Sequence, residues 1–411
     1  MRPSGSSCLV LALMLLATGC EKKPTETITL PPDAKKLALD NSAFAFDLYQ
    51  KLRSREGNLF FSPYSISAAL AMTYAGARGD TEKQMAKTLH FSLDQEDLHP
   101  AFGELQAWLN QIQESGGITL RAANSLWPQE SYKFLDEYLF LTKSYYGVSV
   151  TPVDYVAASE AACKMINKWV EDRTEHKIKD LIQPGILHAL TRLVLVNGIY
   201  FKGTWVSRFD PADTRDTPFH VSPTKDVETR MMSQMEEVRY AEFKSAQILE
   251  LPYVGDRLSM LIVLPEEIDG LGALERSLSV KNLRAWRERL HKRKVNIYLP
   301  KFTMTREFRL DETLQAMGMA DAFSLPPADF SGMTGTPDLF ISAVIHKAFV
   351  EVNEEGTEAA AGTALPAPRA HGIPWPPDFR ADHPFLFLIQ ETRTGSILFL
   401  GRVADPTKSG E

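Results

Sequence analysis

The spacing of apolar residues in the first part of the chain predicts helices. Phe44, Leu48 and Leu52 recur at intervals of four in the segment AFAFDLYQKL, which places them on one face of a helix. The next apolar segment, SPYSISAALAMTYAGA, begins with Ser62 and Pro63, a good cap and a residue suited to the first helical position. Both segments are therefore predicted to be helices with apolar side chains that pack in a core.

Hydrophobic patterns typical of strands dominate the second part. Residues 192–201 and 258–265 are continuous apolar runs, as in strands covered on both faces. Between 295 and 302 apolar and polar residues alternate. Two apolar segments, 385–389 and 397–400, flank a short stretch that contains a glycine, which predicts a hairpin. Helices followed by strands predict an α+β fold with a large sheet.

Composition agrees with one large globular domain. The chain has 411 residues, of which 44% are hydrophobic and 24% are charged, and this is enough to form a large core. No proline-rich gap divides the body of the chain before residue 364, so we expect a single domain over residues 37–407. The formal net charge of −7 does not indicate nucleic acid as a partner.

The N-terminal segment has the pattern of a secretory signal. Leu9–Gly19 is apolar but too short to span a bilayer as a helix, so residues 1–19 are predicted to be a signal peptide. The residues up to Cys20 resemble a bacterial lipobox, with Ala17 where that motif usually has leucine. The resemblance implies a secreted, extracellular protein, held to the bacterial envelope as a lipoprotein only by a lipid on Cys20, with residues 20–36 as a polar tether. Ordinary secretion with a chance cysteine is the alternative.

The three cysteines do not form a disulfide framework. Cleavage of the signal removes Cys8, and lipidation would occupy Cys20, so Cys163 has no partner. We expect Cys163 to be a small packed residue of a helix rather than a reactive thiol.

A search for catalytic and metal-binding motifs gives no candidate. The chain lacks a G-x-S-x-G elbow, an H-E-x-x-H pair and a C-x-x-C motif, and its nine histidines are not at metal-ligand spacing. The segment GLGALE has Glu275 where a phosphate-binding glycine motif needs its third glycine. We therefore expect no cofactor, no metal and no enzyme activity.

Two features leave alternatives open. His346 lies in an apolar segment and is interpreted as a buried, hydrogen-bonded core histidine, although a Ser–His–Asp constellation assembled in space would also use such a residue. The basic run 287–294 is interpreted as a solvated helix end, with a polyanion site as the alternative.

Five segments together resemble the serpin family. They are, in chain order, NLFFSPYSI, LVNGIYFKGTW, VNIYLPKF, HKAFVEVNEEGTEAAAGT and DHPFLFLIQETRTGSILFLGRV, within residues 37–405. Each segment is weak alone, but the order and spacing of all five are specific. Two positions depart from the family pattern: Gly198, where alanine or a larger residue is more usual, and His176, where glycine is usual.

The resemblance implies a fold of about nine helices around three β-sheets, with a long exposed reactive-centre loop at about 354–383. It also implies a serine protease inhibitor that acts as a suicide substrate. A protease cleaves the loop and forms an acyl-enzyme, and the cleaved loop inserts into the central sheet as a new strand, which distorts the trapped enzyme. The implied partners of this monomer are extracellular elastase-like or trypsin-like serine proteases, with papain-like cysteine proteases as a further class.

The first residues of the loop suit such an insertion. Alternate positions from Thr357 to Ala367 are small or apolar and could face a core within a central strand. Gly356 provides a pivot. A merely flexible alanine-rich loop does not explain why one register lacks bulky and charged side chains. The expected hinge consists of Glu354, Glu355, Gly356, Thr357, Glu358, Ala359, Ala360 and Ala361.

Prolines limit how far the loop can insert. Pro366 and Pro368 cannot donate to a ladder, so we expect insertion to be complete only to about Leu365. Incomplete insertion favours partial substrate behaviour. A non-inhibitory serpin that acts as a binding module or a chaperone-like protein is therefore kept as the alternative function.

The position of the reactive bond depends on the direction of counting. The usual family spacing from Glu354 places it between Ala370 and His371, which suits elastase-like proteases. A spacing shorter by one residue places it between Arg369 and Ala370, which suits trypsin-like proteases. A count backward from the C-terminal end of the loop places the bond near Ile373 instead.

The resemblance also implies a polar cluster beneath the central sheet. Ser62, Ser65, Asn197 and His346 are expected to form this shutter cluster, which controls how the sheet opens. Trp205 is expected near the point at which the loop enters the sheet.

Overall fold

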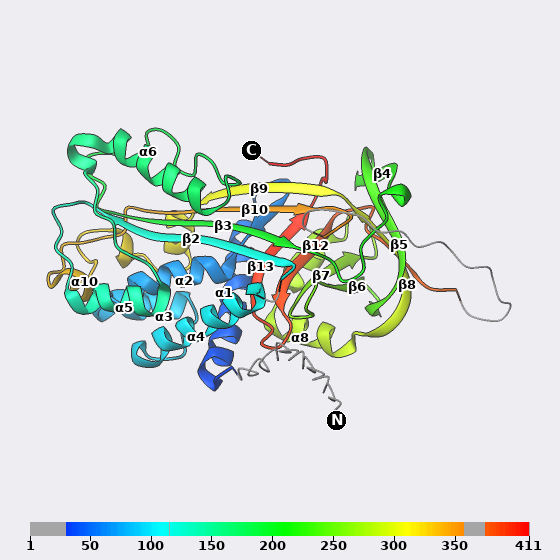
Figure 1. The fold of residues 1–411 in the computed structure, drawn as a ribbon, viewed down its shortest axis with the longest axis horizontal. Coiled ribbons are helices and arrows are strands. Elements are labelled where there is room, and N and C mark those ends of the chain that lie inside the picture. The colour runs from blue at the N-terminus through cyan, green and yellow to red at the C-terminus, as the bar shows by residue number, and fades with distance from the viewer. Residues whose placement is uncertain (1–29, 115, 357–374, 411) are drawn as a thin grey trace, which may run out of the picture.

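The computed structural model describes residues 30–114, 116–356 and 375–410. Within these ranges the chain forms ten α-helices, two short 3-10 helices and thirteen strands, so the expected α+β fold is confirmed (Figure 1). None of the helices in these ranges is long and apolar enough to cross a membrane.

The helices lie mainly in the first half of the chain. Ser62 caps α2 as expected, because its side chain accepts a hydrogen bond from the backbone N–H of Ser65. Asp154 caps α6 in the same way. The helices are α1 (Pro32–Leu52), α2 (Pro63–Tyr74), α3 (Gly79–Thr88), α4 (Gln95–Glu114), α5 (Asp136–Tyr146), α6 (Tyr155–Arg173), α7 (Leu271–Ser277), α8 (Val280–Arg289), α9 (Asp311–Ala316) and α10 (Ser331–Thr334), with 3-10 turns at Pro211–Asp213 and Asp321–Phe323.

The strands are concentrated after residue 190. They are β1 (Leu59–Phe61), β2 (Ile118–Pro128), β3 (Leu193–Gly203), β4 (Arg215–Ser222), β5 (Lys225–Phe243), β6 (Ala246–Pro252), β7 (Leu258–Pro265), β8 (His291–Pro300), β9 (Phe302–Arg309), β10 (Ala343–Val352), β11 (Asp378–Arg380), β12 (Phe385–Glu391) and β13 (Ile397–Val403). The expected hairpin near the end of the chain is β12 and β13, which pair antiparallel.

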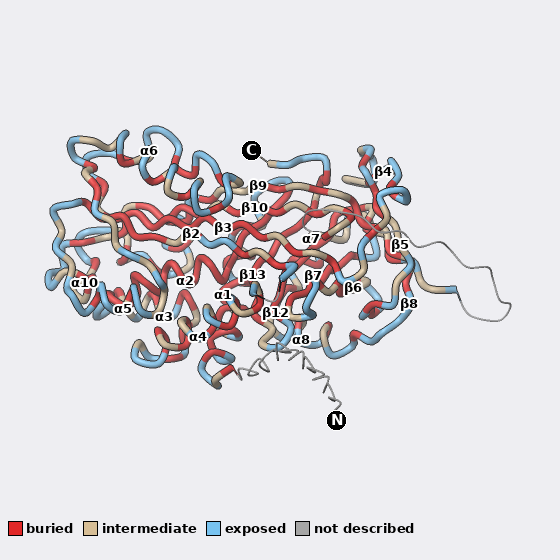
Figure 2. The backbone as a smooth tube through the Cα atoms, in the orientation of Figure 1, coloured by how far each residue is buried: buried red, intermediate tan, exposed pale blue. Residues whose placement is uncertain are grey.

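A four-stranded sheet has the order β2-β3-β10-β9, in which only β3 and β10 run parallel. As predicted from its continuous apolar run, β3 is buried on both faces (Figure 2). Val194 and Val196 pack in the cluster that contains α6, whereas Leu195 and Ile199 pack in the main core. Figure 1 shows α6 over one face of this sheet and α2 on the other.

The remaining strands form one larger sheet of nine strands. The expectation of three sheets is therefore corrected to two hydrogen-bonded sheets among the described residues. The reason is β5, a strand of 19 residues that pairs with β4 near its start, with β6 near its end and with β8 between them. One long strand thus joins two groups of strands.

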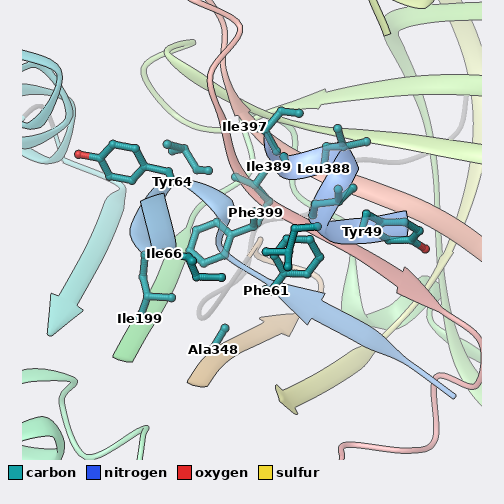
Figure 3. Close-up of a cluster of buried hydrophobic side chains, with 14 of the residues drawn as sticks. Tyr49, Phe61, Tyr64, Ile66, Ile199, Ala348, Leu388, Ile389, Ile397 and Phe399 are labelled. Atoms are coloured by element: carbon teal, nitrogen blue, oxygen red, sulfur yellow. The ribbon is translucent and has the colours of Figure 1, made fainter. Parts of the chain in front are cut away.

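The main core lies between α1, α2 and the two sheets. Figure 3 shows Ile66 of α2 beside Phe61, Ile199 and Phe399, which come from three different strands. The rings of Phe60 and Phe399 are stacked with centroids 5.2 Å apart. Because α2 packs against β3 and β13, its position is tied to both sheets.

Candidate functional site

A buried polar cluster joins α2 to the four-stranded sheet. Ser62 donates its backbone N–H to Nε2 of His346 (3.1 Å) and its hydroxyl to the carbonyl of Leu398 (2.6 Å). Asn197 donates its side-chain amide to the carbonyl of Ser65 (3.0 Å). The four residues implied by the resemblance lie together in this cluster, and none is more than 1% exposed.

Asn124 is a fifth member of the cluster. It is the register neighbour of Asn197, which in turn is the register neighbour of His346, so the three form a row across β2, β3 and β10. The side chain of Asn197 is hydrogen-bonded to both neighbours. The hydroxyl of Ser65 donates to Oδ1 of Asn124 (3.1 Å). Sequence reasoning missed Asn124, because only the strand register places it there.

Both ring nitrogens of His346 are occupied. Nδ1 is bonded to Oδ1 of Asn197, and Nε2 accepts the N–H of Ser62, a pattern that fits a neutral imidazole with its proton on Nδ1. Burial lowers the pKa of His346 to about 3. The prediction of a buried core histidine is confirmed, and this imidazole is not available as the base of a Ser–His–Asp constellation.

The ladder between β3 and β10 covers only part of their length. Its last registered pair is Phe349 with Tyr200. Beyond this pair, β10 continues along β9 to Val352, and β3 continues along β2 to Gly203. Among the described residues, the last three residues of β3 and the last three of β10 therefore do not pair with each other. We call this open end of the sheet the β3–β10 gap.

Glu354 anchors the chain where it leaves β10 at the gap. Its carboxylate lies 2.7 Å from Nζ of Lys301 and accepts the hydroxyl of Thr214 (2.8 Å), and its carbonyl accepts the N–H of Phe209 (2.8 Å). Burial raises the pKa of Glu354, but the bonds from Lys301 and Thr214 outweigh this effect, and the pKa lies below its ordinary value. The carboxylate therefore stays charged at neutral pH.

Glu355 and Gly356 form a turn of the chain at the β3–β10 gap. The N–H of Trp205 donates to the carbonyl of Glu355 (2.9 Å), and Asn353 and Gly356 exchange backbone hydrogen bonds of 2.8 and 3.2 Å. Gly356 has a φ of 133°, and a Cβ at this position would lie 2.1 Å from the carbonyl oxygen of Gly203. Only glycine fits this turn.

Trp205 also lies at the β3–β10 gap. Its indole N–H donates to the carbonyl of Asn353 (3.1 Å), and its ring stacks on Tyr253 with centroids 4.5 Å apart and an interplanar angle of 12°. The resemblance implied that Trp205 lies near the point at which the loop enters the sheet, and this role stays a prediction. Trp205 thus connects the end of β3 to the first residues after β10.

Several predicted site residues lie outside the described ranges, and their roles stay predictions. The described part of the hinge is Glu354–Gly356. The residues outside are Cys20, Thr357, Glu358, Ala359, Ala360, Ala361, Arg369, Ala370 and His371.

The basic run 287–294 is only in part a solvated surface. Arg287 is partly buried, with Nε donating to Oε1 of Gln390 (3.0 Å) and a terminal nitrogen donating to the carbonyl of Gly395 (3.1 Å). Burial lowers the pKa of its guanidinium to about 10. The interpretation as a solvated helix end is therefore wrong for Arg287, whereas residues 291–294 at the start of β8 are exposed.

Cys163 is a partly buried residue of α6, as expected. Its thiol donates to the carbonyl of Ile182 (3.3 Å), and burial raises the pKa of the thiol, which opposes reactivity. Within the described part of the chain, no group of histidine, cysteine, aspartate and glutamate side chains could hold a metal ion.

Sequence comparisons agree with this architecture. Residues 39–406 match the family model described as Serpin (serine protease inhibitor). Leukocyte elastase inhibitor A of Rattus norvegicus is 44% identical over 382 residues, which cover 90% of this chain and 100% of the relative. Leukocyte elastase inhibitor of Xenopus tropicalis is 44% identical over 371 residues, which cover 88% and 97%.

Solved structures give the same result. Uncleaved ovalbumin matches with a TM-score of 0.81 and 33% identity over 90% of this chain and 100% of its own. Maspin matches with a TM-score of 0.84 and 29% identity over 92% and 100%. With a family model that spans the central sheet and the hinge, this chain belongs to the serpin family of serine protease inhibitors.

Proposed function

We propose that this protein traps elastase-like serine proteases by inserting its cleaved loop into the β3–β10 gap. The observation that carries the proposal is the position of Gly356, in a turn at the open end of the gap, where it forms a β-bridge with Thr204 just after β3. The names of its relatives, leukocyte elastase inhibitors, support the class of protease.

The topology defines the inserted strand. Because β3 and β10 are parallel and the chain reverses after β10, a strand that starts at Thr357 enters antiparallel to both neighbours. It replaces the parallel ladder between β3 and β10 by two antiparallel ladders, one with each of these strands. At roughly 1 kcal/mol net for each of about ten additional hydrogen bonds, the gain is on the order of 10 kcal/mol. This gain is large enough to drive the distortion of an attached protease.

The inserted strand must also separate Asn197 from His346. These two side chains are bonded across the line along which β3 and β10 part. We therefore assign the cluster of Ser62, Ser65, Asn124, Asn197 and His346 the role of a latch that keeps the uncleaved sheet closed.

We place the reactive bond between Ala370 and His371, because a small residue before the bond suits elastase-like pockets. The alternative is Arg369–Ala370 with a trypsin-like target. Incubation with pancreatic elastase and with trypsin tests both. We expect a covalent complex on a denaturing gel with elastase, and a released C-terminal peptide that begins at His371. A peptide that begins at Ala370 supports the alternative bond, and papain in the same assay tests cysteine proteases.

Pro366 and Pro368 support the second candidate, a non-inhibitory binding or chaperone-like serpin, because they interrupt the ladder that insertion would form. The same gel separates the two functions. Cleavage without any covalent complex, at every ratio of protease to protein, would show that the protein does not trap proteases.

Secretion and a lipid anchor at Cys20 rest on the N-terminal sequence alone. We propose that the anchored protein acts as a monomer at the outer surface of a bacterial cell. Fractionation tests this directly: the wild-type protein is expected with the membranes, and Cys20→Ser in the soluble fraction. A wild-type protein that is wholly soluble with an unmodified Cys20 would contradict the anchor.

A further inference from the structure

Two arginines that are distant in sequence stack on one buried tryptophan. Trp108 of α4 is 2% exposed. The guanidinium carbon of Arg257 lies 4.7 Å from the centroid of its ring, and that of Arg393 lies 5.3 Å away. Arg257 belongs to the turn between β6 and β7, and Arg393 to the turn between β12 and β13. Two cations therefore share one aromatic ring.

The two turns that carry these arginines are bonded together. Thr392 donates its N–H to the carbonyl of Arg257 (2.9 Å) and its hydroxyl to the carbonyl of Asp256 (3.0 Å). The buried carboxylate of Glu391 accepts the N–H of Arg393 (3.2 Å) and of Thr394 (2.6 Å). Both side chains thus start from fixed backbone positions, which lowers the entropy cost of holding a ligand.

Neither guanidinium donates to another described residue. The ion pairs and side-chain hydrogen bonds within the described ranges do not include the side chain of Arg257 or Arg393. Glu391 is turned toward the backbone of its own turn, and Asp256 is exposed without an ion pair to its neighbour. Because both guanidinium carbons lie within 5.3 Å of one ring centroid, they are at most about 10 Å apart, and an anion near both would offset the repulsion of the two like charges.

We propose that Arg257 and Arg393 bind one tetrahedral oxyanion, a phosphate or sulfate group. A guanidinium presents paired N–H donors that match two oxygens of such a group, and stacking on an aromatic ring orients its plane. The same chemistry is offered by a free inorganic ion and by the phosphomonoester of a larger molecule. The site does not use the guanidinium of Arg287 from the basic run 287–294, which contacts the same turn through the carbonyl of Gly395.

The site is also connected to the hinge. In the turn that contains Arg257, the N–H of Val254 donates to the carbonyl of Thr204 (2.7 Å). Thr204 in turn forms a β-bridge with Gly356. An anion that fixes this turn therefore stabilises the arrangement around the hinge in the uncleaved protein.

The test is a calorimetric titration of the full chain with sodium phosphate, with sodium chloride adjusted to keep the ionic strength constant. We expect saturable binding of one ion and a rise in Tm with phosphate concentration. The double variant R257Q/R393Q is expected to bind at least about tenfold more weakly, because it loses both charge-assisted contacts. Its unfolding curve without phosphate checks that it is folded.

The matched control is R121Q/R230Q, which removes the same charge from two exposed arginines that pair with Glu175 and Asp216. It is expected to bind phosphate like the wild type. Phenyl phosphate distinguishes the two sources of the ligand: tighter binding than phosphate assigns the site to an ester, and equal binding assigns it to the free ion. Undiminished phosphate binding by R257Q/R393Q, or an equal loss in the control, would overturn the proposal.

Discussion

At the scale of single residues, Glu354 determines how the chain leaves β10. Its side chain is 8% exposed, and its partner Lys301 is 36% exposed. Because Thr214 adds a second contact to the same carboxylate, removal of Lys301 leaves a buried charge that only neutral donors stabilise.

We predict that Lys301→Met lowers the free energy of unfolding by about 1–2 kcal/mol, a value reduced for the partial exposure of the lysine. Urea unfolding measures the change. Arg230→Met is the control, because the pair of Arg230 with Asp216 at 3.5 Å is exposed on both sides and is expected to contribute less than about 0.5 kcal/mol. If the two variants lose equal amounts of unfolding free energy, the burial of Glu354 does not strengthen its pair with Lys301.

The buried histidine predicts a dependence of stability on pH. His346 has a pKa of about 3 in the fold, against about 6.5 in an unfolded chain, so its contribution is fully present above pH 6.5 and is lost as the pH falls toward 3. His99, whose pKa burial lowers to about 4, acts in the same direction. Each histidine contributes a slope of up to about 1.4 kcal/mol per pH unit.

Unfolding curves between pH 7.5 and 5 test this, since carboxylates contribute little in that range. His346→Gln is expected to be less stable at neutral pH but to lose less stability on acidification than the wild type. An unchanged slope in His346→Gln would show that this histidine does not cause the pH dependence.

At the scale of elements, the important relation is between β3, β10 and the segment that follows Gly356. The two strands separate where the hinge begins, and the shutter cluster joins them further along. Insertion therefore has to begin at the hinge and then break the contact between Asn197 and His346.

Thr357→Arg tests insertion separately from recognition of the protease. The residue is far from the reactive bond in sequence, so we expect cleavage at the same bond and at a similar rate. A charge in the inward register must be buried as the strand enters, at a cost of several kcal/mol, which slows trapping about a hundredfold or more. The covalent complex on a denaturing gel should therefore disappear, and active protease should be released.

Glu358→Arg is the matched control, because it lies one residue further along in the outward register and should still form the complex. If Thr357→Arg forms as much complex as the wild type, insertion from the hinge is not the mechanism of this protein.

At the scale of the whole molecule, the uncleaved protein is expected to be the less stable of two forms. Cleavage in the loop permits insertion, and a gain on the order of 10 kcal/mol corresponds to a rise in Tm of about 10–15 °C for a domain of this size. Thermal unfolding before and after limited cleavage measures the rise. We expect no such rise in Tm for cleaved Thr357→Arg. A wild-type protein whose Tm does not rise after cleavage would contradict insertion.

The sequence predicted the elements whose pattern is local. The cap at Ser62, the doubly buried strand around Asn197 and the final hairpin follow from residue order, because they depend on neighbours in the chain. The family resemblance supplied the residues of the shutter cluster and the place of Trp205. Asn124 and the burial of Arg287 were missed, since both depend on contacts with residues distant in sequence.

By itself, the sequence determined that this is an α+β protein and predicted a hinge with a register of small residues, because side-chain size and periodicity are properties of the chain alone. The tertiary structure decided that β3 and β10 separate before their ends and that Gly356 turns the chain at this opening. It also brought Arg257 and Arg393 to one tryptophan. These features depend on strand register and on the meeting of distant turns, and the free energy that fixes them comes from packing of the whole fold.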